Sequence, residues 1–168
     1  MALRQLIFLC LLATVLCVKV KLNKKFINQA LKRHNEIRAL HGVDPVVISN
    51  RLSKYAQKRA NKLAKRRDLV HRPNIKYGEN LSFVSGSASG MDHVDNLYTE
   101  EEQHYSDNNY YGREPPQSDF LNYGHFTQIV WKGSRKIGVG KAGGYVVISY
   151  EPAGNFLGQF RENVYKKV

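Results

Sequence analysis

The chain has 168 residues, of which 42% are hydrophobic, and a formal net charge of +12 at pH 7. Its only cysteines are Cys10 and Cys17, both in an apolar N-terminal stretch, so the rest of the chain cannot form an internal disulfide. The fold must therefore be stabilised by its core. The roughly 150 residues that follow the apolar stretch are enough to bury the core of one domain.

The N-terminal stretch has the pattern of a secretory signal peptide. Arg4 precedes an apolar block over residues 6–16, and the small residue Cys17 follows. The block is shorter than the ~20 residues needed to span a bilayer. We therefore predict a signal peptide at residues 1–18 and a single secreted domain at 19–168, with a buried N-terminal helix or a membrane anchor as the alternatives.

Removing residues 1–18 leaves a strongly basic chain, with 25 Lys and Arg against 14 Asp and Glu, or +11. The cations concentrate before residue 68, and this basic surface would attract anionic lipid headgroups or sulfated glycans. The alternative is a solvated helix face. We expect no nucleic-acid partner, because the chain contains no nucleic-acid-binding motif.

Two helices are predicted first. Apolar residues recur with helical spacing over 26–40, where Asn23 can cap the start and Gly42 ends the helix. His34 lies on the apolar face and is expected in the core. Ser49 or Asn50 caps a second helix that runs to about Arg67.

A loop and an extended segment follow. His71 precedes Pro73, so it is expected on a loop just past the second helix. Residues 77–83 are predicted as a short strand. Glu79 lies between apolar and aromatic neighbours, and a buried carboxylate needs a partner. Asn80 begins the only glycosylation sequon, which burial would leave unmodified.

A third helix is predicted over 92–105, and a long polar stretch rich in aromatic residues follows at 106–123. Next, residues 124–131 predict a short amphipathic helix, because Phe126, Ile129 and Val130 lie at helical spacing. His125 would stand at its N-terminal end.

Residues 137–142 and 145–150 predict a β-hairpin across Gly143-Gly144. The second strand is continuously apolar and should be central in the sheet. The cationic end, residues 161–168, is expected to be loosely held. Together the elements predict an α+β fold, with helices on either side of a small, mainly antiparallel sheet.

Four patches resemble one known family. They are Gly124 to Trp131, Tyr150 to Asn155, His34-Asn35 with Arg38, and Tyr77 to Leu81. In the order in which they occur along the chain, they resemble the signatures of the CAP superfamily of cysteine-rich secretory proteins, antigen 5 and pathogenesis-related 1 proteins, also called the SCP domain. The resemblance implies a three-layer α-β-α sandwich. The chain departs from many relatives because its domain is the minimal, cysteine-free type.

The resemblance also implies a cleft with four polar residues. By motif position these are His71, Glu79, Glu101 and His125, with Glu100 as the register alternative to Glu101. Two imidazoles could bind Zn²⁺ or another divalent metal weakly, while the carboxylates hold water.

Two functions remain open. The first is capture of a sterol, a fatty acid or an anionic lipid or surface. The aromatic residues Tyr110, Tyr111, Phe120 and Tyr123 could form a ligand loop, because the corresponding stretch takes part in sterol binding in some relatives; they could equally anchor the loop to the domain. The second is a Zn- or Ser-dependent hydrolase. Ser82 and Ser118 lie near the cleft segments, but neither lies in an activated motif. We therefore favour binding over catalysis.

Overall fold

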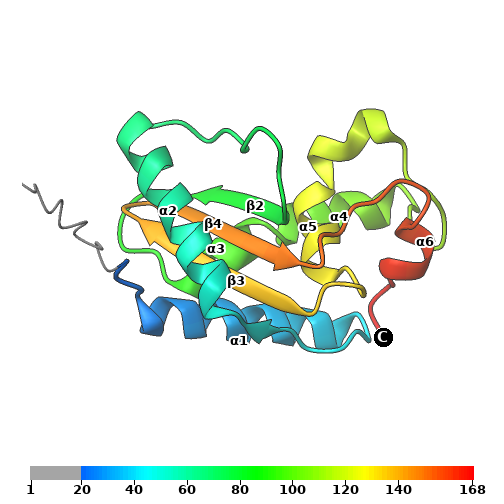
Figure 1. The fold of residues 1–168 in the computed structure, drawn as a ribbon. Helices are drawn as coiled ribbons and strands as arrows, with labels where there is room; N and C mark the ends of the chain where they lie inside the picture. The colour runs from blue at the N-terminus through cyan, green and yellow to red at the C-terminus, as the bar shows by residue number, and fades with distance from the viewer. Residues whose placement is uncertain (1–19) are drawn as a thin grey trace, which may run out of the picture.

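The structure, a computed structural model, describes residues 20–168. The predicted signal peptide and both cysteines lie outside the described residues. Within them, helices lie on both sides of one small sheet (Figure 1). The predicted α+β sandwich is confirmed.

The sheet has four strands in the order β1-β3-β4-β2. β3 (Lys136–Ala142) and β4 (Tyr145–Glu151) form the predicted hairpin, and β2 (Gly78–Phe83) pairs antiparallel with β4. β1 (Val47–Ile48) pairs parallel with β3 and was not anticipated, because two residues carry no periodic signal. The apolar strand β4 is central, and β2 forms one edge of the sheet.

One face of the sheet is covered by α2 (Asn50–Arg66), which Ser49 caps by accepting a hydrogen bond from the Leu52 N–H. The helix comes very close to β3, because a Cβ atom at Gly138 or Gly140 would lie 2.2 Å from the helix backbone. The two glycines therefore set the distance between this layer and the sheet.

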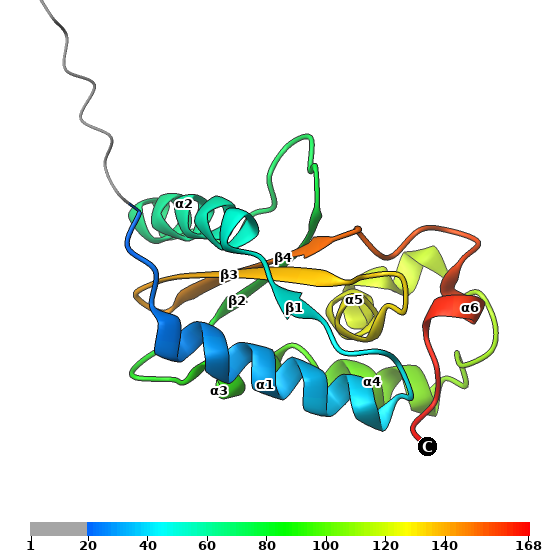
Figure 2. The same cartoon turned by 60° about the horizontal axis from the view of Figure 1, so that its bottom comes forward.

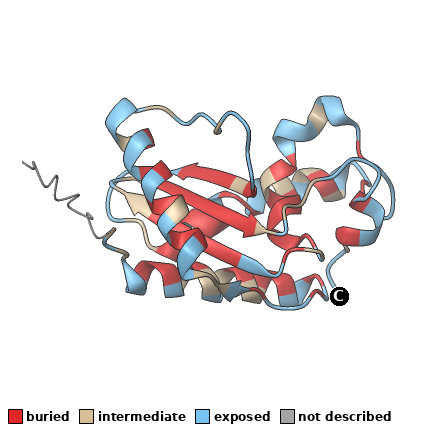
Figure 3. Cartoon of the chain, viewed as in Figure 1, coloured by how far each residue is buried: buried red, intermediate tan, exposed pale blue. Residues whose placement is uncertain are grey.

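On the side of the other face lie α1 (Lys24–Leu40), α3 (Gly90–Asn96) and α4 (Thr99–Asp107), as Figure 2 shows edge-on. Asn23 caps α1, as predicted. His34 is fully buried and bonds to the Ala30 carbonyl and the Tyr150 hydroxyl. Figure 3 shows the resulting buried layer, with exposed surface on the outer sides of the helices.

The helix predicted over 92–105 is two helices, α3 (Gly90–Asn96) and α4 (Thr99–Asp107). The chain leaves α3 through i→i+3 bonds at Leu97 and Tyr98, both of which are buried. The Tyr98 hydroxyl also bonds to His41. Both side chains at the break therefore lie in the core.

The expectation of a loosely held C-terminal end was wrong. After the short helix α6 (Phe160–Asn163), Val164 is 1% exposed and Phe160 likewise packs in the core. The Val168 N–H donates to the Leu40 carbonyl, and Lys167 pairs with the buried Glu102. Although this segment is basic, a backbone hydrogen bond joins it to α1, an ion pair joins it to α4, and two apolar side chains are buried in the core.

Candidate functional site

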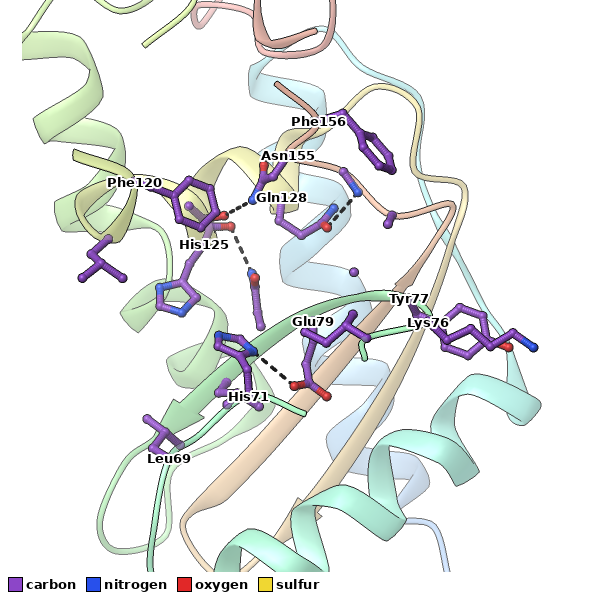
Figure 4. Close-up of a pocket in the computed structure, with 18 residues that line it drawn as sticks. Leu69, His71, Lys76, Tyr77, Glu79, Phe120, His125, Gln128, Asn155 and Phe156 are labelled. Atoms are coloured by element: carbon purple, nitrogen blue, oxygen red, sulfur yellow. Dashed lines mark hydrogen bonds and ion pairs between the residues drawn. The ribbon is translucent and has the colours of Figure 1, made fainter. Parts of the chain in front are cut away.

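A pocket of about 740 Å³ lies along the edge strand β2. Its walls come from the loop between α2 and β2, from the 3₁₀ helix η1 (Gln117–Asn122) with the start of α5 (Gly124–Val130), and from the turn after β4. Figure 4 shows side chains of all three segments facing one cavity. Its volume lies in the range typical of small-molecule sites.

On one wall, His71 pairs with Glu79. The His71 Nδ1 atom lies 3.2 Å from a Glu79 oxygen, and the Arg72 Nε atom lies 3.0 Å from the other. The Glu79 side chain is only 2% exposed. Burial alone would raise its pKa, but the hydrogen bonds and charges of His71 and Arg72 hold the pKa below its usual value. Glu79 is therefore an ionised anchor for the His71 ring.

At the start of α5, His125 pairs with Glu101. The His125 Nδ1 atom lies 2.6 Å from one carboxylate oxygen. The other oxygen accepts the backbone N–H groups of His125 and Phe126 at 2.8 and 2.9 Å. Glu101 thus binds the free N–H groups at the start of α5 and orients the imidazole with the same carboxylate.

The four residues are arranged as two His–Glu pairs. His71, Glu79 and His125 line the pocket, whereas Glu101 lies behind His125. The alternative, Glu100, is exposed, and the contacts to His125 come from Glu101.

The two imidazoles are oriented in the same way relative to their carboxylates. In both histidines Nδ1 faces a carboxylate, which leaves Nε2 as the available ring nitrogen. This matches the second-shell pattern of metal-bound imidazoles. In residues 20–168 there is no group of three or more His, Cys, Asp and Glu side chains placed to hold a metal.

The aromatic residues of the expected ligand loop fall into two groups, one in the pocket and one in the core. Phe120 lines the pocket and is 37% exposed. Tyr110, Tyr111 and Tyr123 instead pack with the core, where their hydroxyls donate to Asp119, Glu102 and the Pro116 carbonyl, respectively. The three tyrosines anchor the loop, which was the alternative interpretation of this stretch.

Several pocket residues were not anticipated. Leu69, Ile75 and Phe156 supply apolar walls from two loops. Gln128 accepts from the Gly154 N–H, and the Asn155 amide donates to the Gly124 carbonyl, so both join the turn after β4 to α5. The Gln128 and Asn155 side chains were visible in the family-like patches, but the apolar loop residues carried no signal.

The sequon and the candidate serines are not free in the pocket. The Asn80 side chain is buried and donates to the His125 carbonyl and the Tyr150 hydroxyl, so the folded chain does not present it for glycosylation. Ser82 is buried against His93 and Asn96, and Ser118 is exposed outside the pocket.

Comparison with known proteins gives the family. The profile of the cysteine-rich secretory protein family, CAP, matches residues 31–150. The chain belongs to the CAP family. It is 39% identical over 152 residues to human Golgi-associated plant pathogenesis-related protein 1, covering 84% of this chain and 94% of that protein.

Two other CAP relatives differ in how much of their own length aligns with this chain. Pathogenesis-related protein 1B of Nicotiana tabacum is 36% identical, covering 77% of this chain and 76% of that protein. Secreted protein RBT4 of Candida albicans is also 36% identical, covering 80% of this chain and 37% of that protein.

The CAP fold is also found in solved structures. The crystal structure of NaASP2 with Zn²⁺ superposes with a TM-score of 0.62 at 22% identity and covers 90% of each chain. At this identity the likeness establishes the fold alone. No helix within residues 20–168 has the length and apolar character to cross a bilayer.

Proposed function

We propose that this CAP-family chain is a secreted, non-enzymatic binding protein that takes a fatty acid or a sterol in the pocket beside β2. The observation that carries the proposal is the distribution of polarity in the pocket. Leu69, Ile75, Phe120, Leu121 and Phe156 line it, while His71 and His125 supply imidazoles from two walls. An amphipathic ligand would place its apolar body against the former and its carboxylate or hydroxyl at the imidazoles.

The same imidazoles are proposed as a weak site for Zn²⁺. NaASP2, which shares the fold, was solved with Zn²⁺. The Glu79 and Glu101 carboxylates face Nδ1 of the two rings and leave Nε2 available to a cation. Calorimetric titration with Zn²⁺ should give weak binding that disappears in His71→Ala/His125→Ala.

Secretion is part of the proposal because of the apolar block at residues 6–16 and because one relative is a secreted protein by name. A hydrolase that uses serine has less support, since none of the described residues that line the pocket is Ser, Thr or Cys.

The proposal is tested by measuring the binding of a fluorescent fatty acid and of labelled cholesterol. Phe156→Glu introduces a charge on the pocket wall at a side chain that is 51% exposed. We expect affinity to fall about tenfold or more, which corresponds to ~1.4 kcal/mol.

The matched control is Phe83→Glu, because Phe83 is 48% exposed on β2 but does not line the pocket. Its affinity should stay at the wild-type value. Wild-type protein that binds neither lipid, or an equal loss in both variants, would contradict the proposal.

A further inference from the structure

Large apolar side chains that face solvent gather around the mouth of the pocket. Residues 20–168 contain eleven such side chains, and seven of them come from the three segments that form the pocket walls. We call these seven the apolar rim: Leu69, Val70, Ile75, Phe120, Leu121, Phe156 and Leu157. Single exposed apolar residues are normal on a protein surface, whereas a cluster of this size marks an interaction surface.

The rim is formed by projecting tips rather than by a flat face. In Figure 1 the loop between α2 and β2 and the η1 turn stand as two separate arches along the upper edge of the molecule. Leu121 is 88% exposed, and Val70 and Leu157 are 59% and 60% exposed. Exposed apolar side chains on protruding loops can insert into the acyl region of a lipid bilayer, with the pocket mouth between them.

Positive charge adjoins the rim. The last turns of α2 present Lys62, Lys65, Arg66 and Arg67 to solvent, and this stretch leads directly to Leu69. Lys76 follows Ile75 and is also exposed.

The acidic side chains of the rim segments are few. They are Asp119, which is hydrogen-bonded to His104, Tyr110 and Asn122, and Asp68, which lies beside four cations of the α2 end. Glu114 lies near Leu157, because it accepts the Gly158 N–H. The cations beside the apolar tips of the α2–β2 loop complement an anionic bilayer, where cations lie among headgroups and apolar side chains enter the acyl boundary.

We propose that the apolar rim is a docking surface for an anionic lipid bilayer, and that docking turns the pocket mouth toward the membrane. A bilayer fits better than a folded protein partner for two reasons. Its surface can accommodate separate protruding loops, and it leaves the pocket mouth open to lipid. The inference rests on the proposed function only for the cargo that would enter the pocket. The docking itself depends on the rim and on the adjoining cations.

The test is co-sedimentation with vesicles of phosphatidylserine and phosphatidylcholine, compared with vesicles of phosphatidylcholine alone. The rim variant is Val70→Asp/Leu157→Asp, because these two residues do not line the pocket. The matched control is Leu40→Asp/Val47→Asp, which makes the same charge change at exposed apolar residues at the end of α1 and in β1.

All variants are expressed from the full-length sequence, and mass spectrometry verifies that they share one N-terminus. A difference between variants then cannot come from the apolar start of the chain. Thermal melting of each variant verifies that it is folded.

We expect wild type and the control to bind anionic vesicles equally, and the rim variant to bind at least tenfold more weakly. Binding should also weaken as salt rises from 0.1 to 1 M, because the screening length falls from about 10 to about 3 Å. Wild-type protein that does not sediment with anionic vesicles, or a control that loses as much binding as the rim variant, would overturn the inference. The rim variant should still bind the soluble fluorescent fatty acid, so a failure of docking is distinguishable from a failure of the pocket.

Discussion

Glu101→Gln is a sharp test of how the candidate site is built. The carboxylate accepts three hydrogen bonds, from the backbone N–H groups of His125 and Phe126 and from the His125 ring. A bond to a charged acceptor contributes about 1.5–3 kcal/mol and a bond between neutral groups about 0.5–1.5 kcal/mol. Loss of the charge therefore costs about 1 kcal/mol per bond, or about 3 kcal/mol in all.

The substitution should also reverse the orientation of one bond. The introduced amide oxygen can still accept both backbone N–H groups, which leaves the amide NH₂ facing Nδ1 of His125. Nδ1 must then accept a hydrogen bond from the amide, so the ring proton moves to Nε2. Nε2 then has no free lone pair with which to bind a cation.

Two measurements verify this. A loss of about 3 kcal/mol lowers the melting temperature by roughly 6–12 °C in a domain of this size. Nitrogen NMR of the ring should show the change of tautomer at His125. Glu100→Gln is the matched control, because Glu100 is the exposed neighbour on the same helix, and it should stay within about 0.5 kcal/mol of wild type. Equal stability of the two variants, or an unchanged tautomer, would refute the reasoning.

Two further predictions concern the core. Burial lowers the pKa of His34 and of His93 to about 4, so both stay neutral in the fold while the unfolded chain takes up protons below pH 6.5. The stabilisation should therefore be present in full above about pH 6.5. From pH 7 to pH 5 the free energy of unfolding, measured by urea denaturation, should fall by about 2 kcal/mol per histidine. A ring NMR signal from either residue that titrates in the folded protein above pH 5 would contradict this. Val164→Ala should cost about 2 kcal/mol, whereas Val168→Ala, at a side chain that is 96% exposed, should cost less than 0.5 kcal/mol in the same assay; equal values would mean that the C-terminal segment is not part of the core.

Local signals predicted most of the elements. Asn23 and Ser49 cap helices that the apolar spacing also predicts, and Gly143-Gly144 marks the hairpin. Such signals depend on residues close together in the chain, so they can be recognised without knowledge of the fold.

The choice between Glu100 and Glu101 needed the tertiary structure. The two residues are adjacent in α4, and only the position of α5 decides which carboxylate meets the start of that helix. The same holds for Tyr110 and Phe120, of which one packs in the core and the other lines the pocket.

The sequence by itself determined the helices α1 and α2, the β3–β4 hairpin and the central strand. It did not determine the break at Leu97, the docking of residues 160–168 or the apolar walls of the pocket. These features arise from contacts between segments far apart in the chain, such as Lys167 with Glu102. The packing of the layers decides which side chain such a residue contacts, and the spacing of residues along the chain does not predict that packing.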